Sequence, residues 1–446
     1  MYRPLEGVKV VDLTLAGSGP SCTKLLCECG AEVIWVESLK GTSTRSVHKF
    51  DFYCTGKKAV SINLKTPEGR RMIEALLKDA NVFVSNYRPK GLRSLGLTYE
   101  DVKKINPGIV YATLTGFGEE GAQADDAGYD PVAFWAKGGM LQDIAEKGSL
   151  CVPPVAMGDI TTGVSLFGGI CAALYRQQAT GEGTHVFNSL LGQAMYMNHD
   201  AVIETQYGEP YPKTRLEPRR AMLNTYRCSD DKWITITITD QFDKYFNPLL
   251  RVLGREDLVG DPRWQCLEDT MYDHAPELVR IFDEGFAKMT QAEAVSALRA
   301  IDMPVSVVQG TADALHDPQV HANKYVYKLK ATVPPGMESA SFGSQTQHSA
   351  GGQADGTSPA SSSEYAAADR SEADAGSAAN SADGAAEEEI YVPSAPFKYD
   401  TVDWNSLPGR PKGPRIGENT VEILQRCGFT EEEIAEMLEK GIARQA

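Results

Sequence analysis

The sequence is poor in the residue patterns that bind metals or form disulfides. Its nine cysteines are scattered, none of them in a CxxC pair, and its seven histidines form neither an HxxxH nor an HExxH motif. Zinc sites draw their ligands from such short spacings, so we expect no metal site. An odd number of dispersed cysteines is typical of free thiols in a reducing compartment.

Positive charge and long apolar runs are also scarce. The chain carries 44 Lys and Arg against 60 Asp and Glu, a formal net charge of −16 at pH 7, which argues against a nucleic-acid or membrane partner. No run of about 18 uninterrupted apolar residues occurs, and residues 1–7 do not resemble a secretion signal. We therefore expect a cytoplasmic protein, in which a local basic patch could still bind a phosphorylated cofactor.

What the chain does contain is an alternation of apolar strands and helices. Its 446 residues, 42% of them hydrophobic, can bury two cores. Strands are predicted at 8–15, 32–37, 59–64, 82–86 and 109–114, and helices at 20–26 and 67–80. This order predicts an α/β fold with a doubly wound, mostly parallel, Rossmann-like large domain over residues 1–207.

The remainder of the chain divides by composition. We expect a linker at 208–225, a smaller α/β domain at 226–330, and a C-terminal segment returning to the large domain at 390–446. Residues 336–389 hold ten acidic residues and one basic residue, and few large apolar side chains. Such a composition cannot bury enough apolar surface to offset chain entropy, so this stretch is expected to be a disordered, low-complexity acidic insertion.

The most informative stretch surrounds Asp159. Apolar residues recur at helical spacing after it, so the acid lies where a buried helix begins. The free amides of a first helical turn stabilise a carboxylate, or the oxyanion formed when a carboxylate attacks a substrate. Gly158 and Gly163 are expected to leave room for a bulky carbonyl compound. An ordinary N-cap, worth about 1 kcal/mol, is the alternative interpretation.

A glycine turn follows the first strand and approaches a dinucleotide-binding fingerprint. Gly17 and Gly19 are followed by Glu37, at the distance where an acid would hold a ribose hydroxyl. However, Cys22 stands where the third glycine is needed, and Pro20 removes an amide. A structural strand-to-helix turn beside a ligand cleft is therefore favoured over a nicotinamide site.

Basic residues gather where predicted strands end and helices begin. A ligand with several phosphates needs such cations, although each one alone could be ordinary solvated surface charge. The candidates are Arg45, Lys65, Arg88, Lys90 and Arg93. Further along, Asp130 is expected to cap the helix that starts at Pro131, and Tyr129 could donate a hydrogen bond to a thioester.

Taken in order, several segments resemble the class III CoA-transferase family, which includes formyl-CoA, carnitine, bile-acid and 2-hydroxyacyl CoA-transferases. The matching segments are 5–13, 30–34, 61–65, 128–130, 138–139, 158–159, 180–183 and 414–420. They run along the whole chain except 336–389. Segments 253–261 and 321–328 are most similar to the branch that acts on 2-hydroxy acids and aryl lactates in anaerobic amino-acid fermentation.

This resemblance implies an interlaced homodimer in which Asp159 is the nucleophile. It also implies that CoA, the co-substrate, lies near Arg45, Leu64, Asn86, Tyr87 and Tyr129. Some members carry glutamine at the position of Gly17, arginine at Ser94 and lysine at Ala127, so this chain departs from them at three CoA contacts. The expected reaction passes CoA from an acyl-CoA to a carboxylic acid through a mixed anhydride and an aspartyl thioester.

Water would have to be excluded from such intermediates, and Phe134, Trp135 and Met157 are candidates for a dry wall. The nearest rival is an α-methylacyl-CoA racemase of the same superfamily, which needs a second acid/base opposite the aspartate. Racemases typically have histidine where Tyr129 stands, and an ordinary tyrosine is a poor base at neutral pH. An NAD-dependent dehydrogenase is the more remote alternative.

Overall fold

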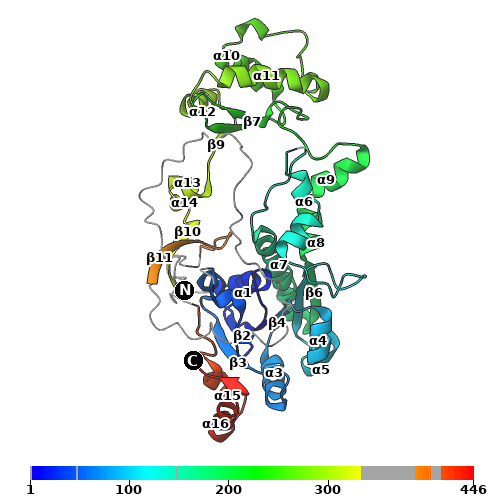
Figure 1. Ribbon diagram of the computed structural model, residues 1–446, viewed down its shortest axis with the longest axis vertical. Helices are drawn as coiled ribbons and strands as arrows, with labels where there is room; N and C mark the ends of the chain where they lie inside the picture. Colours follow the sequence, from blue (N-terminus) through cyan, green and yellow to red (C-terminus); the bar gives the residue numbers. More distant parts are fainter. Residues whose placement is uncertain (1–2, 47–48, 147, 333–386, 401, 403–412) are drawn as a thin grey trace, which may run out of the picture.

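A seven-stranded sheet, in the order β12-β3-β2-β1-β4-β5-β6, forms the centre of the larger unit in the computed structural model (Figure 1). The structure describes residues 3–46, 49–146, 148–332, 387–400, 402 and 413–446. The strands are β1 (Lys9–Leu13), β2 (Glu32–Glu37), β3 (Lys58–Ile62), β4 (Val82–Ser85), β5 (Val110–Thr115), β6 (Thr184–Ser189) and β12 (Ala443–Arg444). All neighbours are parallel except β12, which is antiparallel to β3. The expected mostly parallel α/β sheet is confirmed.

Helices cover both faces of this sheet. One face packs against α1 (Ser18–Glu28) and α7 (Met157–Thr180), through residues such as Leu26 and Ile170. The opposite face is covered by α3 (Pro67–Asp79), α4 (Pro89–Leu95), α5 (Tyr99–Ile105), α15 (Thr420–Arg426) and α16 (Glu431–Glu439). Because both faces are buried, the inner strands are almost wholly apolar rather than alternating.

The strand order reverses between β1 and β4. From β1 the chain proceeds to β2 and β3 on one side, and then returns to β4 and continues through β5 to β6 on the other. The loops that leave β1 and β4 therefore diverge at the carboxyl ends of adjacent strands. In open α/β sheets this switch point is where ligands bind.

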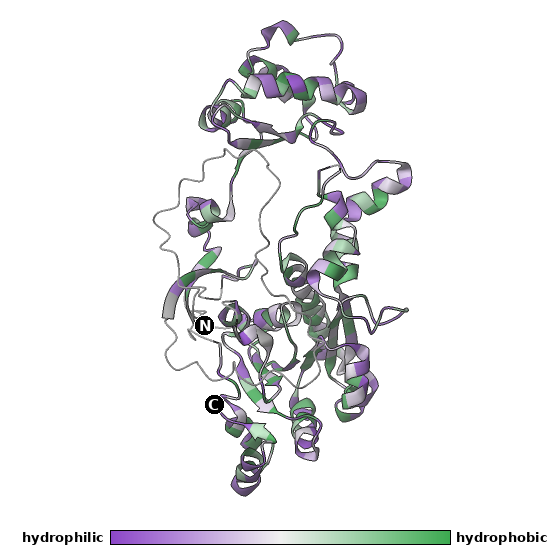
Figure 2. Cartoon of the chain, in the orientation of Figure 1, coloured by the Kyte–Doolittle hydropathy of each residue, from purple (hydrophilic) through white to green (hydrophobic). Residues whose placement is uncertain are grey.

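A second unit has its own core and an antiparallel sheet, β7-β8-β9. Its strands are β7 (Leu223–Arg227), β8 (Trp233–Thr237) and β9 (Val305–Val308), and its helices are α10 (Phe242–Val252), α11 (Ala275–Phe286) and α12 (Gln291–Ala300). Figure 2 shows apolar and polar residues mixed along these helices, as expected where one side of each helix faces the core and the other faces water.

A two-stranded ribbon flanks the predicted insertion. Strand β10 (Val326–Thr332) pairs antiparallel with β11 (Glu387–Pro393), and Thr332 is opposite Glu387. Residues 336–386 of the predicted insertion lie outside the described residues. The last three residues of the prediction, 387–389, belong to β11. The chain then returns to the large sheet, where Asn419 Oδ1 accepts a hydrogen bond of 3.1 Å from the Ala59 amide.

Among the described residues, α7 alone is long and apolar enough to cross a membrane, judged by length and composition only. Its packing supplies another reason for that composition. Phe167 and Leu174 belong to the core cluster that α7 shares with α1 and the sheet. Apolar residues are therefore what this position in the fold requires.

Candidate active site

Asp159 lies in the first turn of α7, two residues after the helix begins at Met157. The alternative N-cap interpretation is wrong, because the N-cap residue is Ala156, which has a φ of 71° and no side-chain cap. Instead, the Asp159 amide donates a hydrogen bond of 2.8 Å to Asp130 Oδ2. Asp130 was expected to cap the π-helix η2 (Pro131–Ala136), yet makes no such bond there. Its buried carboxylate satisfies a free amide of the neighbouring helix α7 instead.

The Asp159 carboxylate faces the start of a second helix, α1. A Cβ atom built on Gly17 would stand only 2.5 Å from Asp159 Oδ2, so the carboxylate fits where a side chain is missing. The Ser18 side chain is near enough to the carboxylate to lower the pKa of Asp159. Asp159 therefore lies near the N-termini of both α1 and α7, which both favour negative charge.

A buried ion pair lies beside the turn that contains Gly17 and stabilises it. Asp12 Oδ2, at the end of β1, is 3.0 Å from Lys57 Nζ and accepts a hydrogen bond of 2.6 Å from Thr23 Oγ1. The turn is also tied to the loop after β4, because the Asn86 side chain exchanges hydrogen bonds of 2.8 and 2.6 Å with the backbone of Leu15. Asp159 thus lies beside the switch point between β1 and β4.

The pKa of Asp159 is raised to about 6, mainly by burial and also by the nearby Asp130 carboxylate, while Ser18 and Lys49 oppose the shift. An ordinary aspartate has a pKa of about 3.9. The difference has a physical cause, since an enclosed carboxylate loses hydration and meets a second negative charge. Asp159 is still mostly ionised above pH 7, as a nucleophile must be.

The two glycines that were expected to leave room for substrate serve close packing instead. A Cβ atom on Gly158 would stand 2.4 Å from Phe134 Cγ, and one on Gly163 would stand 2.0 Å from Ser21 Oγ. Gly158 therefore lets the aromatic ring pack beneath the first turn of α7, and Gly163 lets α1 approach α7. Phe134 and Trp135 are core residues below the site, whereas Met157 is exposed.

A further wall of the site comes from α2 (Phe50–Cys54), which the sequence analysis did not anticipate. Tyr53 belongs to a small apolar cluster against which Ile160 of α7 packs. Sequence reasoning missed Lys49 and Tyr53, because no helix was predicted at 50–54 and only the fold brings α2 to Asp159. It also missed Ser18, because only the packing of α1 on α7 brings that residue to the carboxylate.

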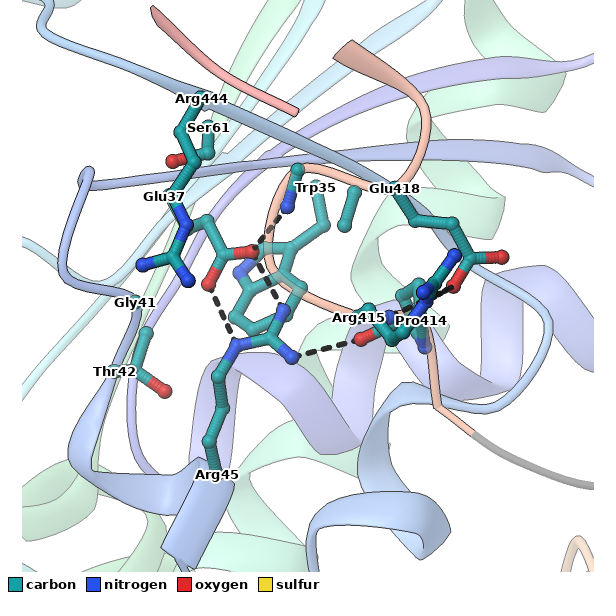
Figure 3. Close-up of polar contacts among 12 residues, drawn as sticks. Trp35, Glu37, Gly41, Thr42, Arg45, Ser61, Pro414, Arg415, Glu418 and Arg444 are labelled. Atoms are coloured by element: carbon teal, nitrogen blue, oxygen red, sulfur yellow. Dashed lines mark hydrogen bonds and ion pairs between the residues drawn. The ribbon is translucent and has the colours of Figure 1, made fainter. Parts of the chain in front are cut away.

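Arg45, a predicted CoA contact, is already paired inside the protein (Figure 3). Its guanidinium donates to both carboxylate oxygens of Glu37, at 2.9 and 2.5 Å, and to the Pro414 carbonyl at 2.7 Å. The side chain of Glu37 is 0% exposed and that of Arg45 is 14% exposed. Glu37 is therefore not free to hold a ribose, which removes the residue basis for a dinucleotide site.

The other predicted cations lie in two places. Arg88, Lys90 and Arg93 gather around Asp125, which accepts bonds of 2.7 Å from the Lys90 amide and from Arg93 Nη2. Lys65 is exposed just beyond β3, beside the half-buried Leu64.

The remaining candidates lie along the loops that follow β4 and β5. Tyr87, after β4, packs against the core on the α3 face of the sheet. Tyr129 is exposed and precedes Asp130. Among the described residues no three His, Cys, Asp or Glu side chains are placed to hold a metal ion together.

Residues 5–361 match the model of CoA-transferase family III. The chain is 34% identical to (R)-2-hydroxy-4-methylpentanoate CoA-transferase of Clostridioides difficile, over 73% of this chain and 84% of that protein. It is 30% identical to cinnamoyl-CoA:phenyllactate CoA-transferase of Clostridium sporogenes, over 97% of this chain and 95% of that protein.

Solved structures have the same fold. A CAIB/BAIF family protein from Brucella suis is 28% identical with a TM-score of 0.63, over 73% of this chain and 89% of that chain. A protein from M. tuberculosis is 22% identical with a TM-score of 0.72, over 94% of this chain and 98% of that chain.

Proposed function

We propose, because the chain belongs to CoA-transferase family III, that this enzyme transfers CoA from an acyl-CoA to a 2-hydroxy or aryl-substituted carboxylic acid. The acceptor class is supported by the relatives, which are named for 2-hydroxy-4-methylpentanoate and phenyllactate. It is also supported by the exposed apolar side chains of Val155 and Met157, which flank the start of α7 and could contact an apolar acid.

The observation that carries the mechanism is the Asp159 carboxylate, held at two helix N-termini beside a glycine. One carboxylate oxygen forms a bond to the thioester carbon, the C–S bond breaks, and CoA leaves as a thiolate. The thiolate then attacks the Asp159 carbonyl of the mixed anhydride, releasing the donor acid as a carboxylate. The acceptor carboxylate reverses these two steps and leaves as the new acyl-CoA.

CoA would enter over the loops that follow β3 and β4. In this arrangement Lys65, Arg88 and Arg93 supply positive charge for its phosphates. Leu64, Asn86, Tyr87 and Tyr129 would then line the approach to Asp159. Arg45 already forms an ion pair with the buried Glu37. Among the predicted CoA contacts, it is therefore the one with the weakest support.

We also propose that the enzyme is a homodimer. Large apolar side chains on the segments that follow β6 are left facing solvent, including Tyr196 at 80% and Tyr207 at 87% exposure. Exposed aromatic residues of this size are enriched at protein interfaces. Light scattering on the purified enzyme should therefore give twice the mass of one chain, and a monomer would contradict this.

Chemical trapping tests the nucleophile directly. Enzyme incubated with a donor acyl-CoA and then with hydroxylamine should yield a hydroxamate at Asp159, found by mass spectrometry of the digested protein. Asp159→Ala should fold, bind acyl-CoA and show no transfer. An unmodified peptide after turnover would refute the covalent route. In a second experiment, the enzyme is incubated with acyl-CoA in D₂O without an acceptor acid, and deuterium at the α-carbon would favour the racemase.

A further inference from the structure

Tyr53 lies in the wall of the site with its ring enclosed by other residues. The ring packs in a cluster with Trp35, Phe50 and Cys54, and Ile160 from the first turn of α7 packs against this cluster. Only 6% of Tyr53 is exposed. Since Ile160 follows Asp159 directly, the cluster places α2 next to the catalytic turn.

The hydroxyl of this buried tyrosine makes no hydrogen bond to any residue that the structure describes. Its oxygen is also not among the fully enclosed polar atoms without partners, so it reaches open space. Burial raises the pKa of Tyr53 most, and the Asp159 and Asp130 carboxylates raise it further. The two carboxylates are thus near enough to the phenol to act on it, and Ile160, the neighbour of Asp159, packs against the cluster that holds the Tyr53 ring.

A neutral phenol in this position can donate one hydrogen bond, and no residue that the structure describes accepts it. The tyrosine as a whole is 6% exposed, so its hydroxyl has access to little solvent, and polar groups in such places normally have a hydrogen-bond partner. The raised pKa keeps the proton on the oxygen at every pH where the enzyme can work. Water can accept this hydrogen bond in the free enzyme, and an oxygen that arrives with the substrate can take its place.

We propose that Tyr53 donates a hydrogen bond to the carbonyl oxygen of the acyl group while Asp159 attacks it. This inference rests on the proposed function and adds a catalytic residue to it. As the bond from the Asp159 oxygen to the acyl carbon forms, the carbonyl electron pair moves onto the acyl oxygen, which becomes an oxyanion. The Tyr53 proton stays on the phenol, and the oxyanion re-forms the carbonyl as the C–S bond breaks.

Tyr53→Phe tests this role because it removes the hydroxyl and keeps the ring. Loss of one oxyanion donor typically lowers the rate by about 100-fold. We expect kcat and the rate of acyl transfer to Asp159 to fall about 100-fold, with a small change in KM. The Tm should stay the same, since no hydrogen bond within the protein is lost.

Tyr245→Phe is a matched control, because Tyr245 is similarly buried but belongs to the core of the small unit. It should transfer CoA at the wild-type rate. If Tyr53→Phe forms the Asp159 adduct as fast as wild type, the role of Tyr53 is refuted while the nucleophile stands. If wild type forms no adduct at Asp159, the proposed function itself fails.

Discussion

At the scale of single residues, the site places two carboxylates, those of Asp130 and Asp159, close enough to repel each other. Asp130 fixes the first turn of α7 by accepting a hydrogen bond from the Asp159 amide, and its charge disfavours ionisation of the Asp159 side chain. The two helix N-termini and Lys49 act in the opposite direction. The balance leaves Asp159 a stronger base than an ordinary aspartate and still ionised near neutral pH, which suits a nucleophile.

This balance predicts the pH dependence of the reaction. Only ionised Asp159 attacks, so kcat/KM should rise through pH 6 and level off above it, because the pKa of Asp159 is about 6. Asp130→Asn keeps a side-chain oxygen for the Asp159 amide but removes the negative charge. Since a nearby negative charge raises the pKa of an acid, the rising limb should move to lower pH in this variant. Rate profiles from about pH 4.5 to 8 would measure the shift, and an unmoved limb would contradict it.

Asp159 could be predicted from the sequence because a lone acid before an apolar helix is a local pattern. Its immediate partners could not be predicted. Gly17, Asp130 and the helix α2 that carries Tyr53 lie near it only because segments far apart in the sequence converge at one end of the sheet. The glycines beside Asp159 were misjudged for the same reason, since their neighbours Phe134 and Ser21 are remote in the sequence.

At the scale of secondary structure elements, the contact of α1 with α7 positions Asp159, the proposed nucleophile. The two helices approach at Gly163, where an added Cβ atom would stand 2.6 Å from the Ser18 carbonyl oxygen as well as 2.0 Å from Ser21 Oγ. A rigid backbone atom at that distance cannot be avoided by a change of rotamer. Any side chain at position 163 therefore has to push the helices apart.

Gly163→Ala should accordingly destabilise the enzyme by about 1–3 kcal/mol, as overpacked cores do. It should also lower kcat/KM, because α1 begins beside Asp159. Gly168→Ala on the same helix is the control: a Cβ atom there meets nothing within 4 Å, and alanine is the better helix former by about 1 kcal/mol. Urea unfolding curves of both variants would check the contrast, which fails if the two changes have the same sign.

The ribbon formed by β10 and β11 gives the predicted insertion a natural boundary. Thr332 and Glu387 face each other at the end of the ribbon, so the chain leaves and re-enters at one place. The low apolar content of residues 336–389 could be recognised from composition, whereas the ribbon could not, because its two strands are separated by that whole stretch.

Replacing residues 333–386 by a short Asn-Gly turn should therefore leave the fold and the transfer rate intact. The replacement joins two residues that are already paired, and two-residue turns of this kind suit antiparallel strands. We expect the same Tm within a few degrees and a kcat within about twofold of wild type. A loss of transfer activity with normal stability would instead assign these residues a part in catalysis.

At the scale of the whole molecule, the sequence predicted the class of sheet and most of its strands, because apolar runs and glycine turns are local signals. The order of the strands required the structure, and with it the location of the site at the switch between β1 and β4. The contacts of Arg45 could not be predicted for the same reason, since they depend on how the strands are arranged. Its position near the end of a predicted strand suggested a phosphate contact, yet its partners are Glu37 and, 369 positions away, the Pro414 carbonyl.

Arg45 therefore acts as a clamp between the sheet and the C-terminal segment, and its substitution should affect stability more than CoA binding. Arg45→Met leaves Glu37 buried without its ion pair, and breaking a buried pair in this way typically costs about 3–5 kcal/mol. The free energy of unfolding should fall by about that amount, with little change in KM for acyl-CoA. Glu37→Gln combined with Arg45→Met should recover part of the loss, because the unpaired charge is gone.

Arg93→Met provides the comparison: its ion pair with Asp125 is exposed, so it should raise KM at nearly unchanged stability. If Arg45→Met instead raises KM and leaves unfolding unaltered, Arg45 is a CoA contact and the clamp is wrong.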